Sequence, residues 1–125
     1  MKPITLELPV KVTFTVEAFG RVVGTIAHNG AEAAVSGSER ESAMEDLRVA
    51  VESAAEGGHG ECFWREAMVD TRWLFRKEGG TMRVAIIRST GTLTGWEHCF
   101  WAECGLEEFR SAMREGMEAY SAAGV

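Results

Sequence analysis

An unbroken alternation of apolar and polar residues near the start of the chain constrains its fold more than any other feature. Every second residue from Ile4 to Val16 is apolar, and threonine or charged residues fill nearly all the positions between them. Successive side chains of a strand point to opposite faces of a sheet, so this period of two predicts a long, half-buried strand. Pro9 has no backbone N–H to donate, which predicts an edge strand or a bulge at that position.

Further strands are predicted where short alternating runs lie between turn residues. These runs cover residues 22–28, 31–35, 62–68, 71–76, 82–87 and 96–103. The run 31–35 is a candidate third strand, and the run 62–68 is either a strand or an irregular lead-in. A turn at Gly79-Gly80 joins the runs 71–76 and 82–87 into one hairpin. A loop over residues 90–95 leads into the last strand.

Two segments carry apolar residues at spacings of three and four, the pattern of a helix that buries one side. The first is predicted to begin at Ser38, which forms a capping box with Glu41, and to end near Glu56 before two glycines. The second is predicted from Leu106 to Tyr120. Six residues of the two stripes are expected to be largely buried: Met44, Leu47, Val51, Phe109, Met113 and Met117.

The predicted elements follow the order β-β-(β)-α-β-β-β-α, and the tight turns between strands require antiparallel pairing. Two helices with one apolar stripe each need a sheet face to cover. The predicted fold is therefore α+β: a two-layer sandwich with a mainly antiparallel sheet of five or six strands and both helices on one face. The length of 125 residues corresponds to a single domain, 1–125, with a flexible tail over residues 121–125.

The charge of the chain argues against nucleic acid as a partner, because nucleic-acid binding needs a basic patch and the net charge is −6. Acids concentrate in residues 38–61 and 89–125, whereas residues 62–88 carry an excess of bases. No apolar run resembles a signal peptide or is long enough to cross a membrane. The three cysteines are odd in number and suggest no disulfide framework, which favours a reducing cytoplasm.

The histidines and cysteines lack the spacing of a metal site. His59 and Cys62 stand three residues apart without a second pair, and the neighbours His98 and Cys99 point to opposite faces of a strand. Cys104 is the best candidate nucleophile because it precedes the second helix, although the surrounding acids are expected to raise the pKa of its thiol. The sequence therefore predicts no metal, no cofactor and no catalytic residue, in a protein that is not an enzyme.

Four tryptophans lie between residues 64 and 101 and form the most unusual cluster in the chain. The face under the helices is expected to hold Trp73, Phe75, Trp96 and Phe100. Trp101 directly follows Phe100, so it is expected to point to the other face of the sheet. That other face is expected to carry Arg72, Leu74, Arg76, Arg83 and Ile87 as well. Tryptophan beside arginine is typical of protein interfaces, although arginine stems or a loop can equally cover such a Trp.

In its element order the chain resembles the small α+β immunity-type proteins of bacteria, which neutralise a cognate toxin by binding it. The resemblance rests on the opening strand, the helix from Ser38 to Glu56, the hairpin Thr71–Ile87, and the strand Trp96–Glu103 leading into Leu106–Tyr120. It implies a non-enzymatic inhibitor, and the acidic balance of the chain fits a basic toxin as its partner.

The sequence thus leads to two main hypotheses about function, and a third, a thiol or metal enzyme, ranks below both. The first is a protein-binding domain that uses either the Trp101 face of the sheet or an acidic helix face containing Glu45 and Glu52. The second is a homodimeric domain that binds a small apolar ligand in a cavity lined by tryptophans.

Overall fold

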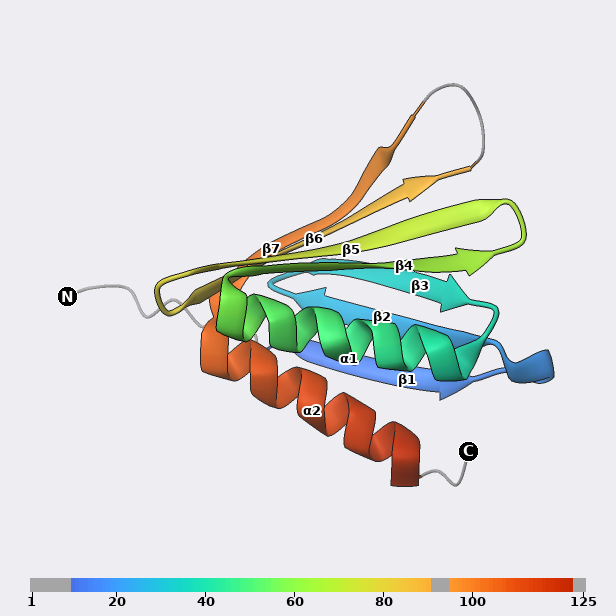
Figure 1. The fold of residues 1–125 in the computed structure, drawn as a ribbon, viewed down its shortest axis with the longest axis horizontal. Coiled ribbons are helices and arrows are strands. Elements are labelled where there is room, and N and C mark those ends of the chain that lie inside the picture. Colours follow the sequence, from blue (N-terminus) through green and yellow to red (C-terminus); the bar gives the residue numbers. More distant parts are fainter. Residues whose placement is uncertain (1–9, 91–94, 123–125) are drawn as a thin grey trace.

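The computed structural model describes residues 10–90 and 95–122, and the described part folds into seven strands and two α-helices (Figure 1). The strands are β1 (Lys11–Val16), β2 (Val22–His28), β3 (Ala31–Gly37), β4 (His59–Glu66), β5 (Val69–Glu78), β6 (Thr81–Ser89) and β7 (Glu97–Gly105). The helices are α1 (Arg40–Gly57) and α2 (Leu106–Ala122), and a short 3-10 turn spans Ala18–Gly20. The predicted α+β class is confirmed.

The strands form two antiparallel sheets rather than the single sheet of five or six strands that we predicted. β1, β2 and β3 form one sheet in that order, and β4 to β7 form the other. Each sheet contains consecutive strands, and α1 carries the chain from β3 of the first sheet to β4 of the second. β1 lies at an edge of its sheet, whereas Pro9, which predicted this edge, lies outside the described residues.

Aromatic rings fill the core between the two sheets. The ring of Trp64 on β4 lies between Phe14 of β1 and Trp73 of β5, with centroid distances of 6.4 and 5.3 Å. Trp73 stacks on Phe75, whose ring centroid lies 5.5 Å from that of Phe109 on α2. These contacts join the inner face of each sheet to the second helix.

Both helices lie on the inner side of the four-stranded sheet (Figure 1). The indole nitrogen of Trp64 donates to the carbonyl of Ala43 on α1 at 2.9 Å, which fixes this helix against β4. Of the six stripe residues expected in the core, Leu47, Val51, Phe109 and Met113 are buried. Met44 and Met117 are only partly buried and pack against the edge of the core. Neither α1 nor α2, the long helices of the described residues, is apolar enough along its length to cross a membrane.

The end of α1 was predicted correctly, but its start was not. Gly58 has a φ of 97° and donates to the carbonyl of Ala54 at 3.0 Å, as expected for a glycine that ends a helix. The capping box at Ser38 is wrong, because the cap residue is Glu39 and it makes no side-chain capping bond. Instead, the backbone N–H of Ser38 donates to the carbonyl of Arg65 at 2.8 Å, so this residue ties the start of the helix to β4.

Candidate functional site

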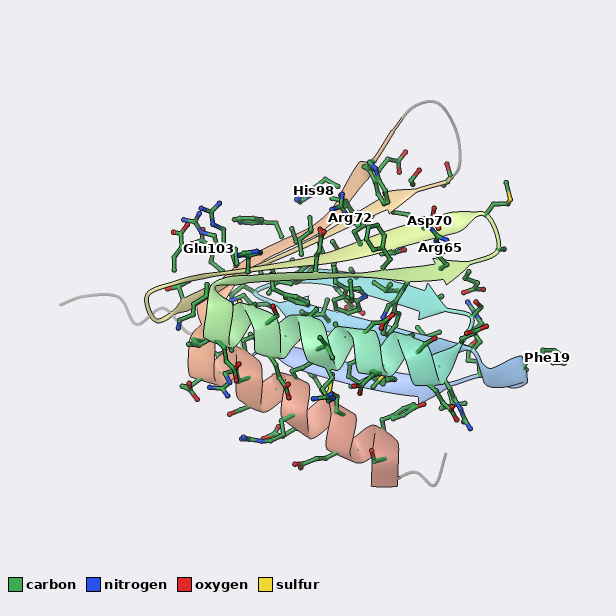
Figure 2. The ribbon with its side chains drawn as sticks, in the orientation of Figure 1. Phe19, Arg65, Asp70, Arg72, His98 and Glu103 are labelled. Carbon is green, nitrogen blue, oxygen red and sulfur yellow. The ribbon has the colours of Figure 1, made fainter. Side chains whose placement is uncertain are left out.

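The outer side of the four-stranded sheet is not covered by any helix or strand of residues 10–90 and 95–122 (Figure 1). We call this surface the open face. Its side chains are His59, Glu61, Phe63 and Arg65 of β4; Asp70, Arg72, Leu74, Arg76 and Glu78 of β5; Arg83, Ala85 and Ile87 of β6; His98, Trp101 and Glu103 of β7; and Trp96 before β7. Figure 2 shows labelled members of this set on the side of the sheet away from the helices.

Strand pairing places the apolar residues of the open face next to one another. One row across the sheet contains Glu61, Leu74, Ala85 and Trp101. The next row contains Phe63, Arg72, Ile87 and His98. Because directly opposed residues of neighbouring strands lie about 5 Å apart, these rows form one continuous surface with an apolar centre.

Trp101 lies on the open face as predicted and keeps 49% of its surface exposed. It is one of the residues that line a hollow of about 400 Å³, together with Leu74, Ala85, Arg76 and Arg83. A half-exposed aromatic ring and a hollow therefore lie side by side on the same surface.

Trp96 also lies on the open face, which corrects the prediction that it shares the buried face with Phe100. A β-bulge causes the difference: Ile86 pairs with Phe100 but Ile87 pairs with His98, so Cys99 is an extra residue in β7. An extra residue reverses the alternation of the strand on its N-terminal side. As a result Trp96 is 43% exposed and His98 is exposed, while Phe100 is buried.

Arg72 is held between two rings of the open face. The centre of its guanidinium group lies 5.0 Å from the centroid of Phe63 and 5.5 Å from that of Trp96. Its Nη2 also forms an ion pair with the carboxylate of Glu61. Phe63, which we did not single out from the sequence, remains 47% exposed. Its position could have been inferred from the alternation of Glu61, Phe63 and Arg65 with buried residues of β4.

The ionic groups of the open face neutralise one another. Arg65 contacts Asp70 at 3.0 Å, and Arg83 contacts both Glu103 and Glu78 at 3.1 Å. The remaining pairs are Arg72 with Glu61 and Arg76 with Glu78. Four arginines thus face four carboxylates, and the open face carries no net charge.

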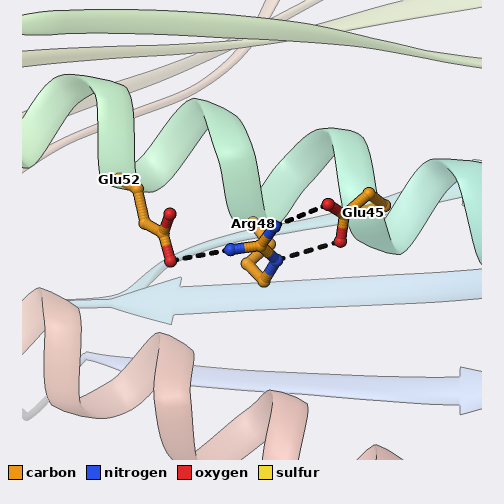
Figure 3. Close-up of polar contacts among 3 residues, drawn as sticks. All are labelled: Glu45, Arg48 and Glu52. Carbon is orange, nitrogen blue, oxygen red and sulfur yellow. Dashed lines mark hydrogen bonds and ion pairs between the residues drawn. The ribbon is translucent and has the colours of Figure 1, made fainter.

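The two predicted acidic residues lie elsewhere, on α1, so the structure divides the six predicted site residues into two separate groups. Glu45 and Glu52 both bind Arg48, at 2.5 and 2.8 Å (Figure 3). The hydrogen bond from Arg48 lowers the pKa of Glu45, and the two carboxylates together raise the pKa of Arg48. Because the two carboxylates share one guanidinium, this triad keeps a net charge of −1.

A groove runs between α1 and α2 beside this triad. Its volume is about 680 Å³, and Val51, Met113 and Met117 supply its apolar surface. Tryptophans do not line it. Of the four tryptophans, Trp64 and Trp73 are buried among other rings in the core, and the other two belong to the open face.

Burial suppresses the reactivity of two of the three cysteines, Cys62 and Cys104. Burial raises the pKa of Cys62 to about 12, with a further contribution from Asp46 and Glu61. Burial, together with Glu108, raises the pKa of Cys104 to about 11. Both thiols are therefore protonated at neutral pH and are poor nucleophiles. Among the described residues, no three histidine, cysteine or acidic side chains are grouped so that they could hold a metal ion.

Comparisons of the chain with protein-family models, with curated proteins and with solved structures gave no significant match.

Proposed function

We propose that this chain is a protein-binding domain and that the open face is its interface. The observation that carries the proposal is the presence of three half-exposed aromatic side chains, Phe63, Trp96 and Trp101, on the open face, which no other described element covers. Fully burying a side chain of this size stabilises a protein by about 2–3 kcal/mol. In the isolated chain about half of each ring remains in water. Contact with a second protein would bury the exposed half and so contribute the rest of that stabilisation.

The chemistry of the open face supports a protein as the ligand. Tryptophan and arginine are the residues most enriched among those that dominate binding energy at protein interfaces. Arg72 is already oriented by its two rings and by Glu61, so little of its conformational entropy is lost on binding. A broad surface with a shallow hollow suits the side chains of a folded partner.

A photo-crosslinking amino acid at position 101 or 63 tests the proposal in the cells that make the protein. Phe19 is the matched control, since it is an aromatic residue that is fully exposed at the far end of the molecule (Figure 2). We expect the same protein to be captured from positions 101 and 63 but not from position 19. Capture from none of the three, or equally from all three, contradicts the proposal.

Inhibition of a basic toxin is a second candidate function, and the charge of the helices favours it. α1 contains five acids and two bases, and α2 contains four acids and two bases, which gives the helices a net charge of −5. Such a surface attracts a basic partner over a distance of several ångströms and speeds its association. The proposal is tested by co-purifying the chain with the product of a neighbouring toxin-like reading frame and measuring the salt dependence of binding. Binding that is insensitive to salt, or no binding, argues against it.

A further inference from the structure

We infer that the partner of the open face is a second copy of this chain. The two copies pack sheet to sheet around a two-fold axis, and Trp101 of each enters the hollow over Leu74 and Ala85 of the other. This inference rests on the proposed function, because it names the occupant of the same face. It is carried by three observations: the charge of the face, its area, and the position of Trp101 beside the hollow.

The charge distribution favours a second copy over a charged partner. The chain as a whole carries −6, so two copies repel each other over most of their surfaces. The open face is the exception, since its arginines and carboxylates pair within the face. A basic partner is drawn instead to the helices, where −5 of the charge lies. Two acidic chains can therefore meet at low electrostatic cost through their open faces.

The area of the open face reaches the lower limit for a specific dimer. The four strands contain 8, 10, 9 and 9 residues. With about 4.8 Å between strands and about 3.3 Å per residue, the sheet covers roughly 500–600 Å². Two such faces bury roughly 1,000–1,200 Å² in total, which reaches the lower limit for a specific protein interface of about 1,000 Å².

The open face carries both a half-exposed ring and a hollow, the two features that a contact between identical faces needs. A two-fold interface brings the same patch of both copies together, so a projection must meet a depression of that same patch. Trp101 on β7 is half exposed, and the hollow of about 400 Å³ is lined by Trp101 itself together with Leu74 and Ala85. Interface tryptophans that dominate binding typically fill pockets of this kind near the centre of the contact. Sheets packed face to face also stand about 10 Å apart, a distance that interdigitated side chains fill.

Analytical ultracentrifugation of the purified chain between low and high micromolar concentration tests this inference. We expect a reversible dimer for the wild-type chain. Trp101→Ala is expected to weaken dimerisation by roughly 30-fold or more, the usual effect of removing such a residue. Leu74→Arg, which places a charge in the hollow, is expected to abolish the dimer. Phe19→Ser is the matched control and should leave dimerisation unchanged, because Phe19 is fully exposed in the turn Ala18–Gly20, outside the four-stranded sheet. Far-ultraviolet circular dichroism checks that each variant is folded.

Disulfide trapping tests the arrangement itself. In a Cys99→Ser background, a mixture of Trp101→Cys and Leu74→Cys chains should form a mixed dimer faster than either chain forms a dimer with itself. A wild-type chain that stays monomeric, or a dimer that Trp101→Ala and Leu74→Arg leave intact, overturns the inference. If the chain is monomeric but crosslinks from position 101 to a different protein, only the identity of the partner is wrong. If the chain is monomeric and position 101 captures nothing, the proposed function fails as well.

Discussion

At the scale of single residues, burial decides which side chains contribute to the fold and which remain available to a partner. Trp73 and Trp101 lie on neighbouring parts of one sheet, yet Trp73 has no exposed surface and Trp101 keeps about half of its own. The alternation of a strand explains the contrast, because it sends one tryptophan into the core and the other to the open face. The two residues should therefore respond in opposite ways to the same substitution.

We expect Trp73→Ala to lower the free energy of unfolding by about 3–5 kcal/mol, as is usual when a large core ring is removed. Trp101→Ala should cost the monomer about 1 kcal/mol or less, because half of the ring is already in water. Urea denaturation at a concentration too low for association measures both values. A loss for Trp101→Ala as large as that for Trp73→Ala would show that Trp101 is a core residue and would remove the main support for the interface.

The thiols give a second prediction at this scale. Burial raises the pKa of Cys62 to about 12 and that of Cys104 to about 11, so the reactive thiolate is scarce in both up to about pH 9. Cys99 is only half-buried. Mass spectrometry after brief iodoacetamide treatment of the native protein at pH 8 should therefore show one modified cysteine, Cys99. In urea all three should react, since unfolding removes the burial. Rapid labelling of Cys104 in the native state contradicts this description.

At the scale of secondary-structure elements, much of the chain could be predicted from local pattern alone. Strand alternation and helix stripes lie within single segments, so β2, β5, β6, β7 and both helices were predicted close to their observed bounds. The bulge at Cys99 could not be predicted, because it depends on how β7 pairs with β6. The misplacement of Trp96 follows from that one residue. The predicted cap of α1 was wrong for a similar reason. The backbone N–H of Ser38 donates to the carbonyl of Arg65, a residue of β4 that is distant in sequence.

Packing of α1 on β4 depends on a residue without a side chain, which leads to a third prediction. A Cβ on Gly60 would lie 2.1 Å from the carbonyl oxygen of Ala50, a backbone atom that cannot move away without displacing the helix. Gly60→Ala should therefore destabilise the protein by about 3 kcal/mol or more, at or above the usual cost of overpacking. Gly57→Ala is the control, since open space surrounds that site and alanine favours a helix by about 1 kcal/mol. Thermal unfolding distinguishes the two, and equal stability of both variants would refute the close contact.

At the scale of the whole molecule, the sequence showed that the acids concentrate in residues 38–61 and 89–125, but it did not predict that the strands divide into two sheets. Alternation fixes which residues share a face of one strand, but it does not say which strands share a sheet. The predicted site combined residues that the fold places on two different surfaces: Arg72, Arg76, Arg83 and Trp101 on the open face, and Glu45 and Glu52 on α1. The result is a chain with acidic helices on one side and a neutral aromatic sheet on the other.

A dimer formed through the open face predicts that the thermal stability of the chain depends on its concentration. If two copies associate through their open faces, dimerisation stabilises the folded state by mass action. A hundredfold increase in chain concentration then adds about 2.7 kcal/mol to the free energy of unfolding of the dimer, enough to raise Tm by several degrees. Differential scanning calorimetry at two such concentrations measures this shift. Trp101→Ala should show a smaller shift, because its association is weakened, whereas Phe19→Ser should behave like the wild-type chain. A wild-type Tm that does not change with concentration would mean that the open face is not occupied by a second copy, and would leave a different protein as its partner.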